Sequence, residues 1–381
     1  MRVAVVHDWL VVYGGAERVL ESILDIFPEA DLFAVIDFVP PEQRAFLRGK
    51  SAQTTAIQGF PMARKHYRKY LPFMPLAIEQ LDSSGYDLII SSCHAVAKGI
   101  ISGPHQLHVS YVHSPIRYAW DMHHQYLQGS SMPRGWRGWL ARWILHRIRQ
   151  WDVTTASRVD VFVANSRFIA ARINKVYRRT ATVIYPPVDD AWYAMGGAER
   201  EDFFVTASRM VSYKRIDLIV EAFSQLPGHR LVVIGDGPDE ARIRAKAGAN
   251  VSFLGHAPAE VLRDHVQRAR AFVFAAEEDF GIAPVEAQMC GTPVIALGRG
   301  GVRETVVDGE TGVFFPRQTV SDLVDAVHRF ERVEDNFAPG RIRAHALQFG
   351  KERFGREFSD LVSRELSAFV EKNGISTPRV V

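Results

Sequence analysis

The chain has little of what marks a secreted, a membrane-spanning or a nucleic-acid-binding protein. It holds only two cysteines, Cys93 and Cys290, which lie far apart in the sequence, so nothing calls for an oxidising compartment. No run approaches the roughly 18 apolar residues needed to span a bilayer, and Met1-Arg2 leads directly into an apolar strand without a cleavable signal segment. The net charge of +3 is too small to indicate nucleic acid by itself. We therefore expect a cytoplasmic protein.

Sequence motifs of several enzyme classes are also missing. There is no C-x-x-C pattern and no D-x-D between apolar strands, and adjacent His123 and His124 would point apart on a helix or a strand. No serine or cysteine nucleophile elbow is found. The pattern G-x-G-x-x-G is not completed after Gly235 and Gly237, because its last position is Glu240. The sequence therefore predicts no metal and no resident cofactor, and it disfavours a nicotinamide dehydrogenase.

The length and composition indicate an ordinary globular protein of two domains. A chain of 381 residues exceeds the size at which one core keeps growing, and 47% of the residues are hydrophobic. Short apolar runs alternate with helical periodicity, which is typical of βαβ units and parallel sheets. The stiff segment 184–189, I-Y-P-P-V-D, is expected to link the domains, 1–186 and 187–354. Strands are expected at 2–6, 88–92, 107–112, 159–164, 182–184, 203–207, 230–234, 251–254, 271–275 and 294–296, and helices at 16–27, 216–226 and near the C-terminus.

Residues 277–301, E-E-D-F-G-I-A-P-V-E-A-Q-M-C-G-T-P-V-I-A-L-G-R-G-G, are the most informative stretch. Glu278 and Glu286 lie eight residues apart, and Gly281 and Pro284 between them exclude one continuous helix. Glu278 is therefore expected on a loop after a strand, and Glu286 at or inside the first turn of the next helix. Both would face the carboxyl edge of a parallel sheet, where ligands of open α/β folds bind. Carboxylates there suit the hydroxyls of a sugar and a ribose.

Two cations follow another strand, in the segment A-S-R-M-V-S-Y-K-R-I-D. Arg209 and Lys214 come just after the strand at 203–207 and before a helix. An arginine fork together with a lysine point charge suits a diphosphate at that edge of the sheet. The alternative is a solvated basic turn, which is where most such pairs are found. Their position at the ligand edge favours a functional role.

Two further features of the N-terminal half are candidates. Gly14 and Gly15 lie between the first strand and the first helix, where an anion can approach the helix N-terminus closely. A plain turn explains these glycines about as well. His113 ends the strand at 107–112, where a histidine is most often a surface or core residue.

The pattern F-G-x-x-x-x-E-A-x-x-C-G-x-P-V-I-A, followed by G-G-x-x-E at Gly300, Gly301 and Glu304, resembles that of the retaining nucleotide-sugar glycosyltransferases of family 4, also called group 1. The resemblance implies the GT-B fold, an α/β architecture of two Rossmann-like domains facing across a cleft, with the C-terminal helix 355–381 packed back on the first domain. It implies transfer of a hexose from a nucleoside diphosphate sugar, which is a co-substrate, to a saccharide or a lipid-linked saccharide. It implies neither a cofactor nor a metal.

The same resemblance assigns roles to individual residues. The family pattern G-R-x-x-x-x-K-G places Arg209 and Lys214 at the diphosphate, although this chain has Ser208 and Arg215 where the family has small residues. Glu278 would bind the sugar, Glu286 the ribose, and His113 would lie beside the donor sugar. The catalytic candidates are therefore His113, Arg209, Lys214 and Glu278. The donor-binding candidates are Gly14, Gly15, Arg209, Lys214, Gly235, Gly237, Leu254, Glu278, Phe280, Gly281, Ile282 and Glu286.

The segment 111–121, Y-V-H-S-P-I-R-Y-A-W-D, resembles a subgroup with mannosyltransferase members, so GDP-mannose is the expected donor and cell-surface polysaccharide synthesis the expected setting. In that subgroup Arg117, Tyr118 and Asp121 follow the histidine. A UDP-sugar donor, a sugar-nucleotide epimerase on the same architecture and a non-catalytic partner-binding protein stay open as alternatives.

A tryptophan- and arginine-rich segment suggests contact with a membrane surface. Between Pro133 and Gln150 lie five arginines and no acidic residue, and four of the seven tryptophans fall between 136 and 151. Basic residues with interfacial tryptophans are typical of a helix lying in an anionic bilayer surface. A second basic patch, at 64–70, precedes an apolar segment. The alternative is a helix packed on the first domain with solvated arginines, and no motif supports nucleic acid. The helical wheel places on one face Trp136, Leu140, Trp143, Ile144, Ile148 and Trp151.

Overall fold

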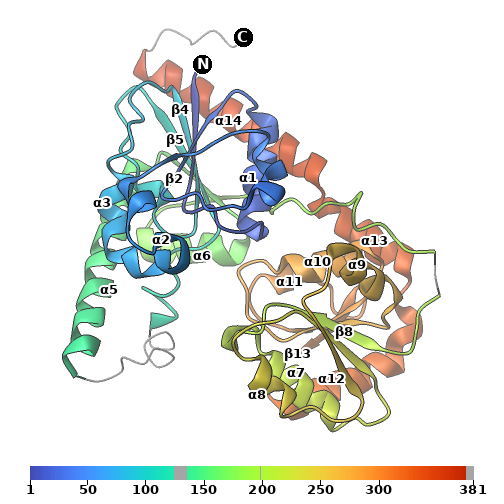
Figure 1. Ribbon diagram of the computed structural model, residues 1–381. Coiled ribbons are helices and arrows are strands. Elements are labelled where there is room, and N and C mark those ends of the chain that lie inside the picture. The colour runs from blue at the N-terminus through green and yellow to red at the C-terminus, as the bar shows by residue number, and fades with distance from the viewer. Residues whose placement is uncertain (124–134, 198, 375–381) are drawn as a thin grey trace. The chain divides into compact units, whose positions relative to one another are not determined.

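The computed structural model describes residues 1–123, 135–197 and 199–374 (Figure 1). The chain divides into two compact units, Met1–Pro186 with Phe354–Val381, and Pro187–Arg353. We call them unit 1 and unit 2. The division falls between the two prolines of the segment 184–189.

Unit 1 is built on a parallel sheet of seven strands in the order β3-β2-β1-β4-β5-β6-β7. The chain leaves β1 toward one edge and returns to β4 on its other side, so the strand order reverses between β1 and β4. Loops that follow these two strands meet at the switch point where ligands bind in such sheets. The strands are β1 (Val3–His7), β2 (Asp31–Ala34), β3 (Gln53–Thr54), β4 (Leu88–Cys93), β5 (Leu107–Val112), β6 (Val161–Ala164) and β7 (Thr182–Val183).

Helices cover both faces of this sheet. The α-helices are α1 (Gly15–Ile26), α2 (Ala63–His66), α3 (Met74–Ile78), α5 (Gly135–Thr155), α6 (Arg167–Tyr177) and α14 (Lys351–Asn373), and the 3₁₀ helices are η1 (Pro41–Leu47), η2 (Ala56–Gly59), η3 (Tyr67–Phe73), η4 (Ala97–Gly99) and η5 (Ala156–Arg158). In the part of the chain that the structure describes, none of the helices combines the length and the apolar character that crossing a bilayer requires.

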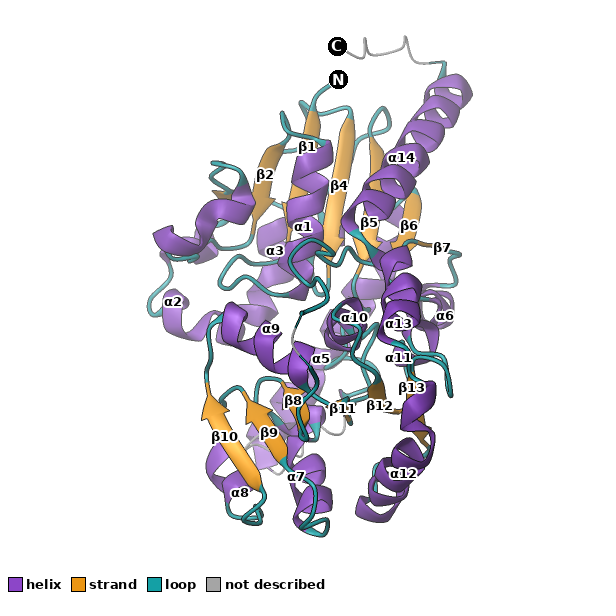
Figure 2. Ribbon diagram, turned by 90° about the vertical axis from the view of Figure 1, so that its right-hand side faces the viewer, coloured by secondary structure: helices purple, strands orange, loops and turns teal. Residues whose placement is uncertain are grey.

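One core of unit 1 joins α1 and α14 to the same face of the sheet. Leu20 and Ile23 of α1 pack with Val5 of β1 and Phe358 of α14, all fully buried. Figure 2 shows both helices in front of this sheet. A second core on the opposite face contains residues of α3 and the η4 segment. The strands are therefore buried on both sides, which explains their nearly continuous apolar sequences.

Unit 2 repeats the architecture with a parallel sheet in the order β10-β9-β8-β11-β12-β13. Its strand order reverses between β8 and β11. The strands are β8 (Phe204–Ala207), β9 (Leu231–Ile234), β10 (Val251–Gly255), β11 (Phe272–Phe274), β12 (Val294–Leu297) and β13 (Gly312–Phe315). The helices are α7 (Ile216–Ser224), α8 (Glu240–Arg244), α9 (Ala259–Arg268), α10 (Ile282–Met289), α11 (Val302–Thr305), α12 (Val320–Val333) and α13 (Pro339–Ala346), with 3₁₀ helices η6 (Ser212–Lys214), η7 (Glu334–Asn336) and η8 (Leu347–Phe349).

The structure corrects two expectations about helices. Helix α10 begins at Ile282, so Glu286 is its fifth residue and lies one turn later than expected. Pro284 is accommodated because it occupies the first turn, where the amide hydrogen that proline lacks has no partner within the helix. On α5 the packed face contains Ile148, whereas Trp136 and Trp143 are exposed, so these residues do not share one face.

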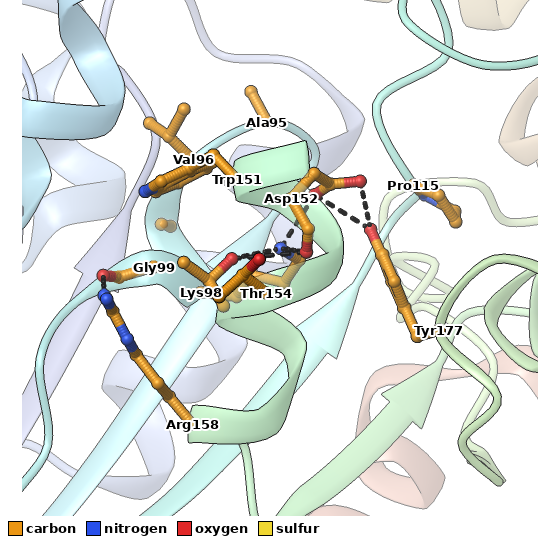
Figure 3. Close-up of polar contacts among 12 residues, drawn as sticks. Ala95, Val96, Lys98, Gly99, Pro115, Trp151, Asp152, Thr154, Arg158 and Tyr177 are labelled. Atoms are coloured by element: carbon orange, nitrogen blue, oxygen red, sulfur yellow. Dashed lines mark hydrogen bonds and ion pairs between the residues drawn. The ribbon is translucent and has the colours of Figure 1, made fainter. Parts of the chain in front are cut away.

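A buried ion pair fixes α5 to η4 within unit 1 (Figure 3). The Lys98 ammonium forms an ion pair with Asp152 Oδ1 at 2.7 Å and donates to the Asp152 carbonyl at 2.9 Å and to Thr155 Oγ1 at 3.0 Å. Asp152 Oδ2 in turn accepts from Trp120 Nε1 at 2.8 Å and from the Tyr177 hydroxyl at 3.0 Å. The ammonium therefore has both a counter-charge and hydrogen-bond acceptors, which is what a buried charge requires.

Candidate active site

Two predicted site residues come together at the switch point of unit 2. Lys214 lies in η6 after β8, and Glu278 lies on the loop after β11, the neighbouring strand. The Lys214 ammonium forms an ion pair with Glu278 Oε1, and both side chains are about a fifth exposed, at 22% and 18%. The pairing places a cation and a carboxylate, 64 residues apart in sequence, at the carboxyl edge of the sheet.

The loop that carries Arg209 is fixed against the loop after β9. The Met210 amide donates to the Asp236 carbonyl at 2.6 Å, and the Ser208 amide donates to the Ile234 carbonyl at 3.0 Å. Gly235 and Gly237 make this approach possible, because a Cβ at either position would overlap the backbone of Ser208 or Met210. Both glycines also have positive φ, 122° and 154°. The exposed Arg209 side chain therefore projects from a loop with a well-supported backbone.

A second pair of glycines supports the Glu278 loop. The Gly301 amide donates to the Glu278 carbonyl at 2.8 Å. A Cβ on Gly300 would overlap that same carbonyl, and Gly300 has φ of 74°. Sequence reasoning used these glycines only as part of a family pattern. Their physical role is to let the loop after β12 pack directly on the loop that carries the carboxylate.

The remaining donor-binding candidates of unit 2 differ in how exposed they are to solvent. Gly281 caps α10 with φ of 85°, and Ile282 and Glu286 are half-buried on that helix. Phe280 is buried and packs on Phe349 at 5.6 Å between ring centroids, so its side chain supports the loop. Leu254 is exposed on the edge strand β10. Contact of these residues with a donor stays a prediction.

Arg215 occupies a strained position at the start of α7. Its φ of 56° and ψ of 33° are left-handed, and it is the N-cap residue of the helix. Its side chain donates to Gln318 Oε1 at 3.1 Å and lies 3.4 Å from Asp217 Oδ1. A small residue at this position, as in the family pattern, would adopt the conformation at lower cost because glycine has no Cβ.

In unit 1, His113 belongs to a chain of polar side chains at the ends of β1, β4 and β5. Ser92 Oγ lies 2.9 Å from His113 Nε2 and 3.1 Å from His7 Nδ1. His7 Nε2 lies 3.5 Å from Glu17 Oε1. Burial, together with the neighbouring His94 and His7, lowers the pKa of His113 well below its ordinary value. His113 is therefore neutral at physiological pH and can donate or accept a hydrogen bond.

A buried carboxylate organises the switch point of unit 1. Asp8 accepts the backbone amides of His94, Ala95, Val96 and Ala97 at 2.5–2.9 Å and lies 3.0 Å from His94 Nδ1. Burial alone would raise the pKa of Asp8, but His94 and these amides outweigh it and the pKa is lowered. Burial lowers the pKa of His94, but the neighbouring Asp8 carboxylate raises it by more, so the pKa of His94 is raised overall. Sequence reasoning missed both residues, although Asp8 directly follows the buried strand β1 and His94 directly follows the buried strand β4.

Gly14 and Gly15 lie at the N-terminus of α1, as expected, but the amide of Gly14 already has a partner. It donates to Glu17 Oε2 at 3.0 Å in a capping arrangement. Gly14 has φ of −134°, which any residue can adopt. Gly15 is exposed. The amide of Gly14 is thus already hydrogen-bonded and is not available to an anion. Binding of an anion at the first turn of α1, where Gly15 is exposed, stays a prediction.

Comparison with known families agrees with this architecture. A profile described as Glycosyltransferase Family 4 matches residues 13–192, and one described as Glycosyl transferases group 1 matches residues 194–343. Together they span most of the chain. The chain belongs to glycosyltransferase family 4, group 1. The resemblance read from the F-G-x-x-x-x-E pattern is confirmed at this level.

Curated relatives match this family 4 chain over part of its length. The D-inositol 3-phosphate glycosyltransferase of Mycobacteroides abscessus is 32% identical over 189 residues, which are 46% of this chain and 42% of that protein. The protein of the same name from Mycobacterium avium is 31% identical over 196 residues, 47% of this chain and 46% of its own. The chain thus spans less than half the length of the curated relatives it matches.

Solved structures resemble the family 4 chain over nearly its whole length. HepE of Anabaena in complex with UDP-glucose has a TM-score of 0.70 at 19% identity and covers 95% of this chain and 99% of its own. The sucrose-phosphate synthase of Thermosynechococcus elongatus has a TM-score of 0.73 at 18% identity, with coverage of 96% and 99%. These likenesses confirm the predicted GT-B fold of two Rossmann-like parallel-sheet domains.

Proposed function

We propose that the chain transfers a hexose, with retained anomeric configuration, from a nucleoside diphosphate sugar to a saccharide or a lipid-linked saccharide. The observation that carries the proposal is the meeting of Lys214 and Glu278 at the switch point of unit 2, on loops that glycines hold together. A cation for a leaving diphosphate and a carboxylate for sugar hydroxyls are what this reaction needs at one edge of a sheet.

The proposed reaction breaks one bond, forms another and gives five side chains a role. The bond between the anomeric carbon and the phosphate oxygen breaks, and its electron pair leaves with the diphosphate. The acceptor hydroxyl oxygen bonds to the anomeric carbon, and its proton passes to the departing phosphate oxygen. Arg209 and Lys214 would stabilise the charge that develops on the diphosphate, Glu278 would accept hydrogen bonds from the sugar, and Glu286 from the ribose. The neutral His113 would hydrogen-bond a sugar hydroxyl without acting as a base.

GDP-mannose is the proposed donor, with support from the resemblance of segment 111–121 to mannosyltransferases. A UDP-sugar is the second candidate, because HepE was crystallised with UDP-glucose. The acceptor is proposed to belong to cell-surface polysaccharide synthesis. D-inositol 3-phosphate is a further acceptor to test, because the curated relatives are D-inositol 3-phosphate glycosyltransferases. A lipid-linked acceptor would require the enzyme at the cytoplasmic surface of a membrane.

Nucleotide binding and nucleotide release test the proposal in two steps. Thermal melting with GDP, UDP, ADP and their sugar conjugates identifies the donor, because a ligand that binds the folded chain raises its melting temperature by mass action. Release of free nucleotide is then measured with and without candidate acceptors. Acceptor-dependent release of one nucleotide supports transfer. Absence of any thermal shift and any release would refute it, and turnover of the donor to an isomeric sugar nucleotide would indicate an epimerase.

The charge of Lys214 is tested against a matched ion pair in the same unit. Replacing one preorganised stabiliser of developing charge costs about 3–4 kcal/mol, or about 10²–10³ in turnover, so Lys214→Gln should reduce kcat by that factor. Lys246→Gln is the control, because Lys246 pairs with Glu221 at 2.5 Å and precedes the amino end of β10, at the opposite edge of the sheet. Equal turnover of the two variants would contradict the assignment, and a non-catalytic protein would bind nucleotide without turnover.

A further inference from the structure

Helix α5 carries an exposed stripe of large apolar side chains on the side that faces away from its packed face. The packed face is formed by residues that include Leu145, Ile148 and Asp152. The stripe has the spacing i, i+3, i+4, i+7 of one helix face. Its members are Trp136 at 71% exposed, Trp139 at 66%, Leu140 at 38% and Trp143 at 49%. Three exposed tryptophans in two turns are unusual, because exposed apolar residues on soluble proteins are normally scattered singly.

A second exposed apolar group lies on the segment 60–76, which packs beside α5. Leu71 of η3 contacts the cluster formed by Leu145 and Ile148, and Trp151 of α5 packs on the core that contains Met74. Trp151 Nε1 also donates to Glu79 Oε1 at 2.9 Å. Figure 1 draws α2, α3 and α5 on the same side of unit 1. The exposed apolar side chains of this segment are Phe60, Met62, Phe73 and Leu76.

The sequence around the stripe and around the segment 60–76 is basic. Residues 56–78 and 122–151 hold nine of the 46 lysines and arginines of the chain and none of its 43 aspartates and glutamates. The rest of the chain is therefore net negative, although the whole chain has a charge of +3. The positive charge is concentrated beside the tryptophan stripe, where Arg137, Arg142 and Arg147 are exposed on α5.

We propose that the tryptophan stripe of α5 and the segment 60–76 form a docking surface for an anionic bilayer. Tryptophan prefers the membrane–water interface, where its ring is apolar and its N–H stays hydrated. The surrounding cations are attracted to anionic headgroups. A second copy of the chain fits this surface poorly, because a two-fold contact would place the same basic patch against itself. This inference goes beyond sugar transfer and does not depend on it.

Vesicle co-sedimentation of the full chain tests the proposal. Vesicles of phosphatidylcholine alone are compared with vesicles that also contain phosphatidylglycerol. The chain should sediment with the anionic vesicles, weakly or not at all with the neutral ones, and less as salt is added. The triple variant Trp136→Ala, Trp139→Ala, Trp143→Ala should weaken anionic binding by about tenfold or more. Arg142→Gln should weaken it by about fivefold.

Val153→Ala is the matched control, since Val153 is an exposed apolar residue of α5 outside the stripe, and it should bind vesicles like the parent chain. Circular dichroism verifies that each variant keeps its helices. No sedimentation of the parent chain with either vesicle, or equal binding of the triple variant, would overturn the proposal. So would a change of the triple variant from dimer to monomer without vesicles, which would identify a self-association surface. Thermal shift with nucleotide is measured separately, so a failure of docking is distinguished from a failure of the proposed function.

Discussion

Removal of the buried lysine of unit 1 should destabilise that unit far more than removal of an exposed cation. Lys98 is 1% exposed and Asp152 is 0% exposed, and the ammonium has one ion pair and two hydrogen bonds. In Lys98→Met the Asp152 carboxylate loses its counter-charge but keeps two neutral donors, Trp120 Nε1 and the Tyr177 hydroxyl. Figure 3 shows Lys98 and Tyr177 beside Asp152. Leaving one member of a buried pair uncompensated costs about 3–5 kcal/mol, so the free energy of unfolding of unit 1 should fall by that amount.

Tryptophan fluorescence during urea unfolding measures this loss, because six of the seven tryptophans, all except Trp192, belong to unit 1. The double variant Lys98→Met, Asp152→Asn should recover about 2 kcal/mol, since the amide oxygen still accepts hydrogen bonds while the buried charge is gone. Arg364→Met is the control. Arg364 is 63% exposed and pairs with Glu365, so its loss should cost less than about 1 kcal/mol.

Two results would refute this reasoning. A loss below about 1 kcal/mol for Lys98→Met would mean that the ion pair contributes no more than an exposed pair. A double variant whose loss equals the sum of the single losses would mean that the charges are not coupled. The slope of unfolding free energy against urea must stay the same in each variant for the comparison to be valid.

Three further predictions concern the loops around the two switch points. Arg215→Gly should stabilise unit 2 by about 0.5–1 kcal/mol in thermal unfolding, because it relieves the left-handed backbone; a loss would show that the Gln318 contact dominates. Gly300→Ala should cost about 1–3 kcal/mol and reduce the nucleotide-dependent thermal shift, since its Cβ would displace the Glu278 carbonyl. Gly309→Ala, with φ of 81° and open space around its Cβ, is the control for backbone strain alone. Finally, the pKa of His94 is higher in the folded chain than its unfolded value near 6.5, so His94 stabilises unit 1 below that pH and this stabilisation is lost as pH rises through the folded pKa. The urea midpoint of unit 1 should therefore decline above about pH 6.5, and it should decline less in His94→Gln.

Sequence patterns located the strands that carry the site, because each is an apolar run buried on both faces. They also placed Lys214 and Glu278 on loops after β8 and β11, and these loops are neighbours in the sheet. The strands β2, β3 and β13 were not predicted. β2 and β3 lie toward one edge of the unit 1 sheet, and β13 is an edge strand of the unit 2 sheet. The chain from Glu17 through His7 and Ser92 to His113 was also missed, because its members come from segments far apart in sequence and no local spacing relates them.

The face of α5 was misjudged for a physical reason. Its sequence has large apolar residues all around the helix, so periodicity alone does not select a packed face. What selects the face is Asp152, whose carboxylate must meet Lys98 in the interior. Leu145 and Ile148 lie on the same helix face as Asp152 and are therefore buried with it. The three tryptophans of the stripe lie on the opposite face and are exposed. The same buried pair that stabilises unit 1 thus determines which side chains of α5 are available to a membrane. Any variant that tests the docking surface must therefore leave Lys98 and Asp152 intact.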